Sequence, residues 1–146
     1  MPKQLNLDKT YLKIASTWAN NMSNARRLKV GCIIVNEGQI ISDGFNGTPS
    51  GFDNNCEYDT YKDGHPILVT KPEVLHAESN ALMKLCKSTN SSLGSTIYLT
   101  HSPCFDCSKL ILQSGIVRVV YNMEYRTNDG INFLKQSDIT VDQINI

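Results

Sequence analysis

Two cysteines three residues apart follow a proline in the segment SPCFDC, residues 102–107. Cys104 and Cys107 could form a disulfide, supply two metal ligands, act as a redox couple or lie in the core as plain thiols. We expect both in the first turn of a helix, where backbone N–H groups and the helix dipole lower the pKa of a thiol. This spacing also brings both sulfurs near one point, as a metal site requires.

His76 is the expected third ligand, because it also opens a helix and both helices are expected to begin at the same edge of a sheet. Zinc takes four ligands, so water would fill the fourth position, as it does in catalytic zinc sites. Glu78 follows two residues later and offers a carboxylate that can accept a proton from that water. The pattern H-x-E followed by P-C-x-x-C is a signature of zinc-dependent nucleobase deaminases. A closed structural zinc site and a thioredoxin-like redox pair remain alternatives.

The composition limits the classes of protein to which the chain can belong. Its 146 residues are enough for one domain with a full core, and 40% of them are hydrophobic. The 14 Lys and Arg residues balance the 14 Asp and Glu residues, which disfavours a surface that binds long nucleic acid. The chain has no apolar stretch of membrane-spanning length and its start does not resemble a signal peptide, so we expect a cytoplasmic protein without membrane contacts. In a reducing compartment, five cysteines favour metal binding or catalysis over disulfides.

Hydrophobic periodicity predicts the elements that position these residues. Helices are expected at 8–22, 76–87, 103–114 and 129–137, and strands at 29–35, 40–45, 95–100, 117–122 and 139–144. Because the later strands alternate with helices, we predict a partly parallel sheet with helices on both faces. Residues 46–75 show little periodicity and are expected to be a functional or disordered loop.

Four segments resemble the cytidine and deoxycytidylate deaminase superfamily: RRLKVGCIIV, GFNGTPSGFDNNC, HAESNAL with THSPCFDCSKLI, and VVYNMEYRTNDG. The second and fourth resemble deoxycytidylate (dCMP) deaminases in particular, and together the four span residues 26–130. The resemblance implies a three-layer α/β/α sandwich around a five-stranded mixed sheet. It also implies hydrolysis of dCMP to dUMP, a thymidylate precursor, by a homohexamer that dCTP activates and dTTP inhibits.

The resemblance further implies a role for each matched residue. His76, Cys104 and Cys107 would hold one zinc ion, and Glu78 would carry protons while water attacks carbon 4 of the cytosine ring. The expected substrate contacts are the backbone of Ala77 and Ser102 at the pyrimidine edge, Asn46 at the sugar hydroxyl, and Arg27, Tyr125 and Arg126 at the phosphate. The expected effector residues are Gly47, Ser50, Gly51 and Asn55.

Two positions depart from the family pattern. Ala25 stands where many bacterial and phage relatives carry a cysteine that binds a second, structural zinc ion. Cys56 and His65 alone cannot complete such a site, so we expect a single zinc ion per chain. Phe45 stands where the family commonly has tyrosine, which removes a hydroxyl group.

Several other residues have plain structural interpretations. Cys32 and Cys86 are expected to be core thiols, His65 a surface residue, and His101 a residue that faces away from the metal site. The acidic residues of the long segment are expected either to be solvated or to hold Mg²⁺ carried by a nucleoside triphosphate; they are Asp53, Glu57, Asp59 and Asp63.

Two other functions stay open at this point. A deaminase that acts on RNA or single-stranded DNA is disfavoured by the zero net charge, because strand-binding grooves carry basic surface. A zinc-binding interaction module without activity is disfavoured by the presence of Glu78.

Overall fold

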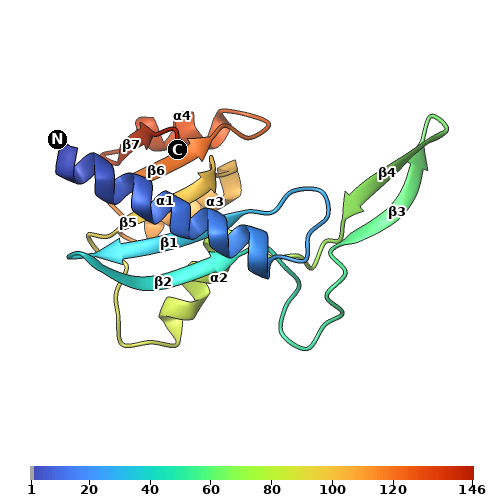
Figure 1. The fold of residues 1–146 in the computed structure, drawn as a ribbon, viewed down its shortest axis with the longest axis horizontal. Coiled ribbons are helices and arrows are strands. Elements are labelled where there is room, and N and C mark those ends of the chain that lie inside the picture. The colour runs from blue at the N-terminus through green and yellow to red at the C-terminus, as the bar shows by residue number, and fades with distance from the viewer. Residues whose placement is uncertain (1) are drawn as a thin grey trace.

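The computed structural model describes residues 2–146 (Figure 1). The helices are α1 (Pro2–Met22), α2 (Ala77–Cys86), α3 (Phe105–Gln113) and α4 (Asp129–Lys135). The strands are β1 (Gly31–Asn36), β2 (Gln39–Phe45), β3 (Glu57–Lys62), β4 (His65–Thr70), β5 (Thr96–His101), β6 (Arg118–Met123) and β7 (Thr140–Gln143). Within this described part of the chain, no helix is both long and apolar enough to cross a membrane.

The main sheet has five strands in the order β2-β1-β5-β6-β7. β1 pairs antiparallel with β2 and β5, whereas β5, β6 and β7 are parallel to one another. The predicted partly parallel sheet is therefore confirmed. Parallel pairing places the C-terminal ends of β5 and β6 at one edge, where the end of β2 and the start of β1 also lie.

Alternate side chains of the central strands enter two separate cores. Ile33, Tyr98 and Val120 pack with Leu12 and Ala15 of α1 on one face. On the other face a larger core joins the strands to α2, α3 and α4; its strand members are Cys32, Ile34, Ile97, Leu99, Val119 and Tyr121. The expected three-layer α/β/α sandwich is confirmed, and Cys32 is a core thiol as predicted.

A hairpin was missed in the segment expected to be a loop. β3 and β4 pair from Glu57 opposite Thr70 to Lys62 opposite His65, and the hairpin projects from the rest of the molecule (Figure 1). Neither strand shows a clean alternation of buried and exposed residues, because most of the hairpin is exposed on both faces. The predicted solvent exposure of His65 is confirmed, but the residue begins a strand rather than lying in a loop.

Helix α1 begins at Pro2, earlier than the predicted start at residue 8, so Asp8 lies within the helix. Its carboxylate is buried and accepts hydrogen bonds from Arg118 Nη1 and Nη2, each at 2.8 Å, and from the Tyr98 hydroxyl at 2.7 Å. Burial raises the pKa of Asp8, but hydrogen bonds from Arg118, Tyr98 and Gln4 outweigh this effect and hold the pKa below its ordinary value. The ion pair therefore joins α1 to the middle of the sheet.

Replacing Asp8 with asparagine should lower the free energy of unfolding by about 2–3 kcal/mol, because Arg118 would lose its buried counter-charge. Asp142 also pairs with Arg118 but is 42% exposed, so Asp142→Asn should cost less than about 1 kcal/mol. Urea denaturation of the three proteins measures both differences. Equal losses in the two variants would contradict the importance of the buried pair.

The same pair predicts the acid response of the fold. Because the folded-state pKa of Asp8 is lowered, its stabilising effect is complete above the ordinary value of 3.8 and is lost as the pH falls through the folded-state pKa. Asp8→Asn should remove this part of the pH dependence.

Candidate active site

Two helix starts meet at the edge of the sheet where β5 and β6 end. His76 and Cys104 occupy the N-cap positions of α2 and α3, so each helix begins one or two residues later than predicted. The N–H group of Cys107 donates to Cys104 Sγ at 3.4 Å, which makes the Cys104 side chain the cap of α3. Pro103 therefore precedes the helix instead of opening it.

His76, Cys104 and Cys107 form a compact group of possible metal ligands. Their ligand atoms lie within 4.8 Å of one another. His76 Nδ1 is 3.5 Å from Cys104 Sγ and 3.3 Å from Cys107 Sγ. All five cysteines of the chain are free thiols, which excludes the disulfide interpretation for this structure. One imidazole nitrogen and two sulfurs are a donor set that fits zinc.

Two glycines allow the helix starts to approach the site. A side chain at Gly44 of β2 would place its Cβ 2.2 Å from the carbonyl oxygen of Ala77, so α2 can pack on β2 only because this residue is glycine. At Gly130 of α4 a Cβ would lie 2.3 Å from the Pro103 carbonyl and 2.8 Å from the Cys104 carbonyl. Both ligand-bearing segments are thus held by backbone contacts that leave no room for a methyl group.

Glu78 is the buried acid of the site, with 5% of its surface exposed. Burial raises its pKa to about 7, so both protonation states are accessible near neutral pH. Hydrogen bonds from the Cys107 thiol, the His76 ring and the Cys107 N–H group lower the pKa of Cys104 to about 4. The hydrogen bond to Cys104 raises the pKa of His76. The group therefore offers an accessible thiolate beside a carboxyl group that can exchange a proton.

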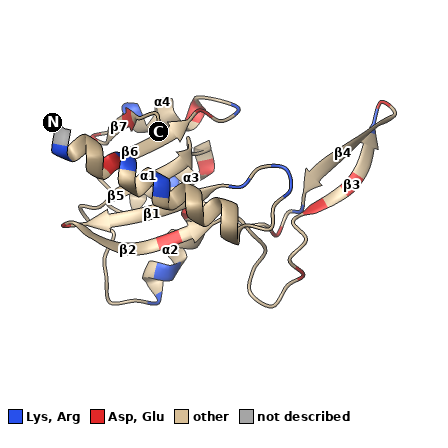
Figure 2. Cartoon of the chain, viewed as in Figure 1, with Lys and Arg blue, Asp and Glu red and all other residues tan. Residues whose placement is uncertain are grey.

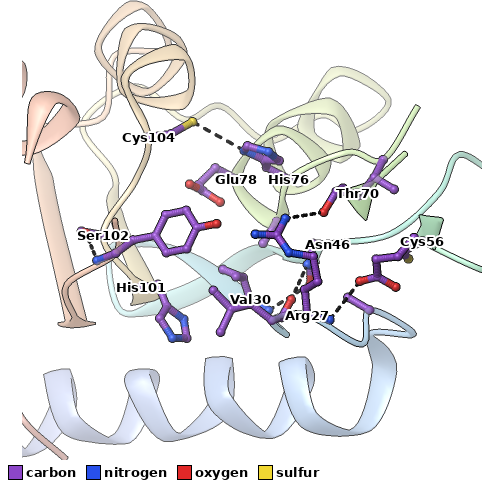
Figure 3. A pocket seen from close by; sticks show the side chains of 16 residues that line it. Arg27, Val30, Asn46, Cys56, Thr70, His76, Glu78, His101, Ser102 and Cys104 are labelled. Atoms are coloured by element: carbon purple, nitrogen blue, oxygen red, sulfur yellow. Dashed lines mark hydrogen bonds between the residues drawn. The ribbon is translucent and has the colours of Figure 1, made fainter. Parts of the chain in front are cut away.

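A pocket extends from these residues toward the hairpin (Figure 3). The predicted site residues that line it are Arg27, Asn46, His76, Ala77, Glu78, Ser102, Cys104 and Tyr125. Cys107 lies beneath the group and is buried. The structure thus gathers the predicted metal, acid and substrate residues from distant parts of the chain.

Asn46 holds the irregular segment before β1 in place. Its Oδ1 accepts hydrogen bonds from Ser23 Oγ at 2.8 Å and from the Val30 N–H group at 2.9 Å. Its Nδ2 donates to the Leu28 carbonyl at 2.8 Å. One Nδ2 hydrogen remains for a ligand, so the residue can position the chain and still donate into the pocket.

The two neighbouring arginines lie in different surroundings. Arg27 lines the pocket, and its Nη1 donates to Thr70 Oγ1 at 2.9 Å. Arg26 turns to the hairpin and forms ion pairs with Glu57 and Asp59. Of these two arginines, Arg27 is therefore the one that lines the pocket.

The residues after β6 contribute one wall of the pocket. The N–H group of Tyr125 donates to Ser102 Oγ at 2.8 Å, which holds the tyrosine over the site. Arg126 lies outside the pocket, with its guanidinium carbon 5.4 Å from the centre of the Tyr125 ring. Of the expected phosphate contacts, Arg27 and Tyr125 therefore line the pocket and Arg126 does not.

Several residues lie elsewhere than predicted. Cys86 is exposed rather than in the core, because it follows Leu85 by about 100° around the helix and leaves the apolar face. His101 lines the pocket wall, and its Nδ1 lies 2.9 Å from Thr100 Oγ1. It is not part of the ligand group.

The possible remnants of a second zinc site are far apart along the hairpin. Cys56 and Ala25 are buried at the base of the hairpin, whereas His65 follows the turn at its other end. In residues 2–146, the acidic side chains of the hairpin form no group of three or more ligands with them.

The expected effector residues lie on the segment between β2 and β3. The Gly47 N–H group donates to the Leu75 carbonyl at 3.1 Å, so it is not free to bind a phosphate as predicted. Asn55 Oδ1 accepts from Arg26 Nη2 at 3.2 Å. Ser50 and Gly51 form an exposed turn, and Gly51 has a φ of 88°. Through the two backbone hydrogen bonds between Gly47 and Leu75, this segment contacts the residue that precedes His76.

Sequence reasoning missed the contribution of Glu57 and Thr70, which also line the pocket. Glu57 is buried and is neither solvated nor a metal ligand as expected. Asp63 and Gly64 carried the signal for the hairpin that brings both residues here. Their φ values of 53° and 77° are those of a type I′ turn, for which Asp-Gly is a preferred sequence.

Comparison with known proteins also indicates a zinc site in this region of the chain. The family described as the cytidine and deoxycytidylate deaminase zinc-binding region matches residues 5–123. The chain belongs to this deaminase family. Its members bind zinc in the matched region, and the His76, Cys104 and Cys107 group fits that ion.

Three relatives extend the comparison. A crystal structure of dCMP deaminase from the cyanophage S-TIM5, in complex with dCMP and dUMP, is 46% identical, with a TM-score of 0.84 over 95% of this chain and 97% of that one. Deoxycytidylate deaminase of Mycobacterium phage D29 is 35% identical over 80% of this chain and 94% of its own length. The Saccharomyces cerevisiae deoxycytidylate deaminase is 37% identical over 93% of this chain. The match spans only 44% of the length of the yeast protein.

We expect the purified protein to contain about one zinc ion per chain, because one group of three ligands gathers in the described residues. Cys107→Ser should lose most of the metal, since a serine hydroxyl is a poor zinc ligand. Cys86→Ser is the matched control at an exposed position and should retain it. Elemental analysis of the three proteins tests this, and two zinc ions per chain would contradict the single-site prediction.

Proposed function

We propose that this chain is a single zinc-dependent deaminase domain that hydrolyses dCMP to dUMP and ammonia. The observation that carries the proposal is that one pocket is lined both by His76, Cys104 and buried Glu78 and by Arg27. A base could reach the metal group while a phosphate reaches the arginine. The cyanophage enzyme bound to dCMP and dUMP supports this choice of substrate.

His76, Cys104 and Cys107 would hold the zinc ion, which supplies Lewis-acid activation of a water molecule. Glu78 would take a proton from that water and deliver it to the ring nitrogen next to carbon 4. The oxygen of that water would bond to carbon 4, and Glu78 would then move the remaining hydroxyl proton to the amine, which leaves as ammonia as the carbon 4 carbonyl forms. Its pKa of about 7 suits a group that must both accept and donate protons at neutral pH.

Other residues would orient the nucleotide. The backbone of Ala77 and Ser102 would contact the pyrimidine edge beside the metal, and Asn46 would donate its remaining amide hydrogen to the sugar hydroxyl. Arg27 would bind the phosphate, with Tyr125 close by. The two thiol ligands need a reducing compartment, which agrees with the cytoplasmic location expected from the sequence.

A turnover screen with dCMP, CMP, deoxycytidine and dCTP tests the proposal. We expect the highest kcat/KM with dCMP and release of one ammonia for each dUMP formed. Release of ammonia from none of the four by zinc-loaded protein would contradict it. Tight, salt-sensitive binding of an oligonucleotide with slow mononucleotide turnover would favour a strand-editing deaminase instead.

Glu78→Gln should retain zinc and lose turnover by more than about 10⁴-fold, because one residue serves several proton transfers. Glu37→Gln makes the same chemical change at the exposed β1–β2 turn and should leave both properties unchanged. Metal content and kcat with dCMP are measured together. Near-normal turnover in Glu78→Gln would rule out this mechanism.

The same proposal includes regulation in an assembly of identical subunits. The hairpin exposes Tyr58 and Tyr61 by 51% and 76%, and a lone two-stranded hairpin gains little stability by itself, so contact with another copy, as in a hexamer, would stabilise it. Ser50, Gly51 and Asn55 would contribute to a site for dCTP or dTTP, with Mg²⁺ arriving on the triphosphate. Binding there would act through the Gly47–Leu75 backbone pair, which adjoins Asn46 and His76.

We expect dCTP to activate the enzyme, dTTP to inhibit it, and the rate to depend sigmoidally on dCMP when neither is present. The shift in activity is limited by the difference in effector affinity between the two loop arrangements. Initial rates over a range of dCMP, with and without each triphosphate, provide the test. Hyperbolic kinetics that ignore both triphosphates would remove the regulatory proposal and leave the active site unaffected.

A further inference from the structure

One buried carboxylate in the pocket takes part neither in the metal group nor in the proposed substrate contacts. Glu57 is 1% exposed, begins β3 and lines the pocket. Its Oε2 accepts hydrogen bonds from the N–H groups of Arg26 at 2.9 Å and of Arg27 at 3.0 Å. Its Oε1 has no hydrogen-bond partner in residues 2–146 and lies 3.6 Å from Arg26 Nε. Burying a carboxylate costs free energy unless hydrogen bonds compensate it, so the hydrogen-bond partners of Glu57 indicate its role.

The partners of Glu57 are the backbone groups of an irregular segment. Residues 24–30 have no helix or strand of their own to satisfy their N–H groups. The carboxylate satisfies two consecutive N–H groups with one oxygen, and so fixes the backbone at the residue whose side chain enters the pocket. These two hydrogen bonds connect the backbone of Arg26 and Arg27 to the hairpin.

A second link comes from the opposite strand of the hairpin. Thr70 is the residue paired with Glu57 across the base of the hairpin, and its hydroxyl accepts a hydrogen bond from Arg27 Nη1 at 2.9 Å. The hairpin base therefore holds both the backbone and the guanidinium of Arg27. In contrast to Arg26, Arg27 forms no ion pair with a carboxylate anywhere in the described chain. Its other guanidinium N–H groups can bind an anion.

We propose that Glu57 is a positioning residue that sets the affinity of the pocket for the substrate phosphate by fixing Arg27, with Thr70 as its partner. This inference rests on the proposed function, in which Arg27 contacts the phosphate of dCMP. In this proposal the hairpin base determines the preference for a nucleotide over a nucleoside. The residues at the metal carry out the chemistry and do not set this preference. The hairpin thus becomes part of the substrate site.

The test compares dCMP with deoxycytidine, which lacks the phosphate, in zinc-loaded protein. Glu57→Ala removes both backbone hydrogen bonds and should raise KM for dCMP about 10- to 100-fold. Glu57→Gln keeps one amide oxygen as acceptor and should restore much of the loss. Thr70→Val should raise the same KM severalfold. In all three variants, kcat with dCMP and kcat/KM with deoxycytidine should change by less than about twofold.

Asp59→Asn is the matched control, because Asp59 pairs with Arg26 on the same hairpin but is exposed and has no contact with Arg27. It should leave KM for dCMP unchanged. Equal losses on dCMP and deoxycytidine in the Glu57 variants would show a general structural role and overturn the inference, as would no change on either substrate. If Glu57→Ala does not fold, as judged by circular dichroism, Thr70→Val decides, and an unchanged KM for dCMP in that variant overturns the inference.

One further outcome separates this inference from the proposed function. Wild-type protein that deaminates deoxycytidine as efficiently as dCMP would contradict the role of Arg27 and the proposed substrate, and the inference would fall with them. A wild-type preference for dCMP that survives in Glu57→Ala would overturn the inference alone.

Discussion

The close packing of two helix starts against one edge of the sheet is the constraint on which the site depends. A tetrahedral metal site tolerates little displacement of its ligands, and here the ligands come from segments 28 residues apart in the chain. Gly44 and Gly130 let the backbone before each helix pack where even a methyl group would collide. Parallel pairing of β5 and β6 then places Ser102 and Tyr125 beside the same point. His76 Nδ1 and the two cysteine sulfurs come together because α2 and α3 both begin at this edge of the sheet, more than because of any single contact.

The walls of the pocket are built in two different ways. The metal ligands stand at the starts of α2 and α3, which pack into the larger core; Cys107 is buried, whereas Cys104 is half-buried and His76 is exposed. Arg27, the proposed phosphate ligand, lies on an irregular segment and is held by the hairpin base through Glu57 and Thr70. Basic and acidic residues are interspersed along the chain (Figure 2), so binding of a small anion must depend on such a local arrangement and not on overall charge. Under the proposed function, changes in the hairpin base would alter nucleotide affinity without disturbing the chemistry at the metal.

The sequence allowed most of the sheet and the metal group to be predicted, because buried strands, capped helices and the H-x-E and P-C-x-x-C motifs leave local patterns. The first helix was predicted to begin at residue 8, but Asp8 lies within α1 and forms a buried ion pair, and only the sheet shows that Arg118 lies next to it. The hairpin was missed because strands exposed on both faces have no burial pattern, although Asp63 and Gly64 marked its turn. Glu57 could not be assigned a role from sequence, since its partners are backbone N–H groups of a segment 30 residues away.

The central claim is an open zinc site with one nitrogen and two sulfur ligands from the protein. X-ray absorption at the zinc edge of the purified protein tests it most directly. The account predicts two sulfurs at about 2.3 Å, one imidazole nitrogen at about 2.0–2.1 Å and one light atom from water, with that last position changing when dUMP is added. A zinc ion with four protein ligands whose surroundings ignore the nucleotide would contradict it.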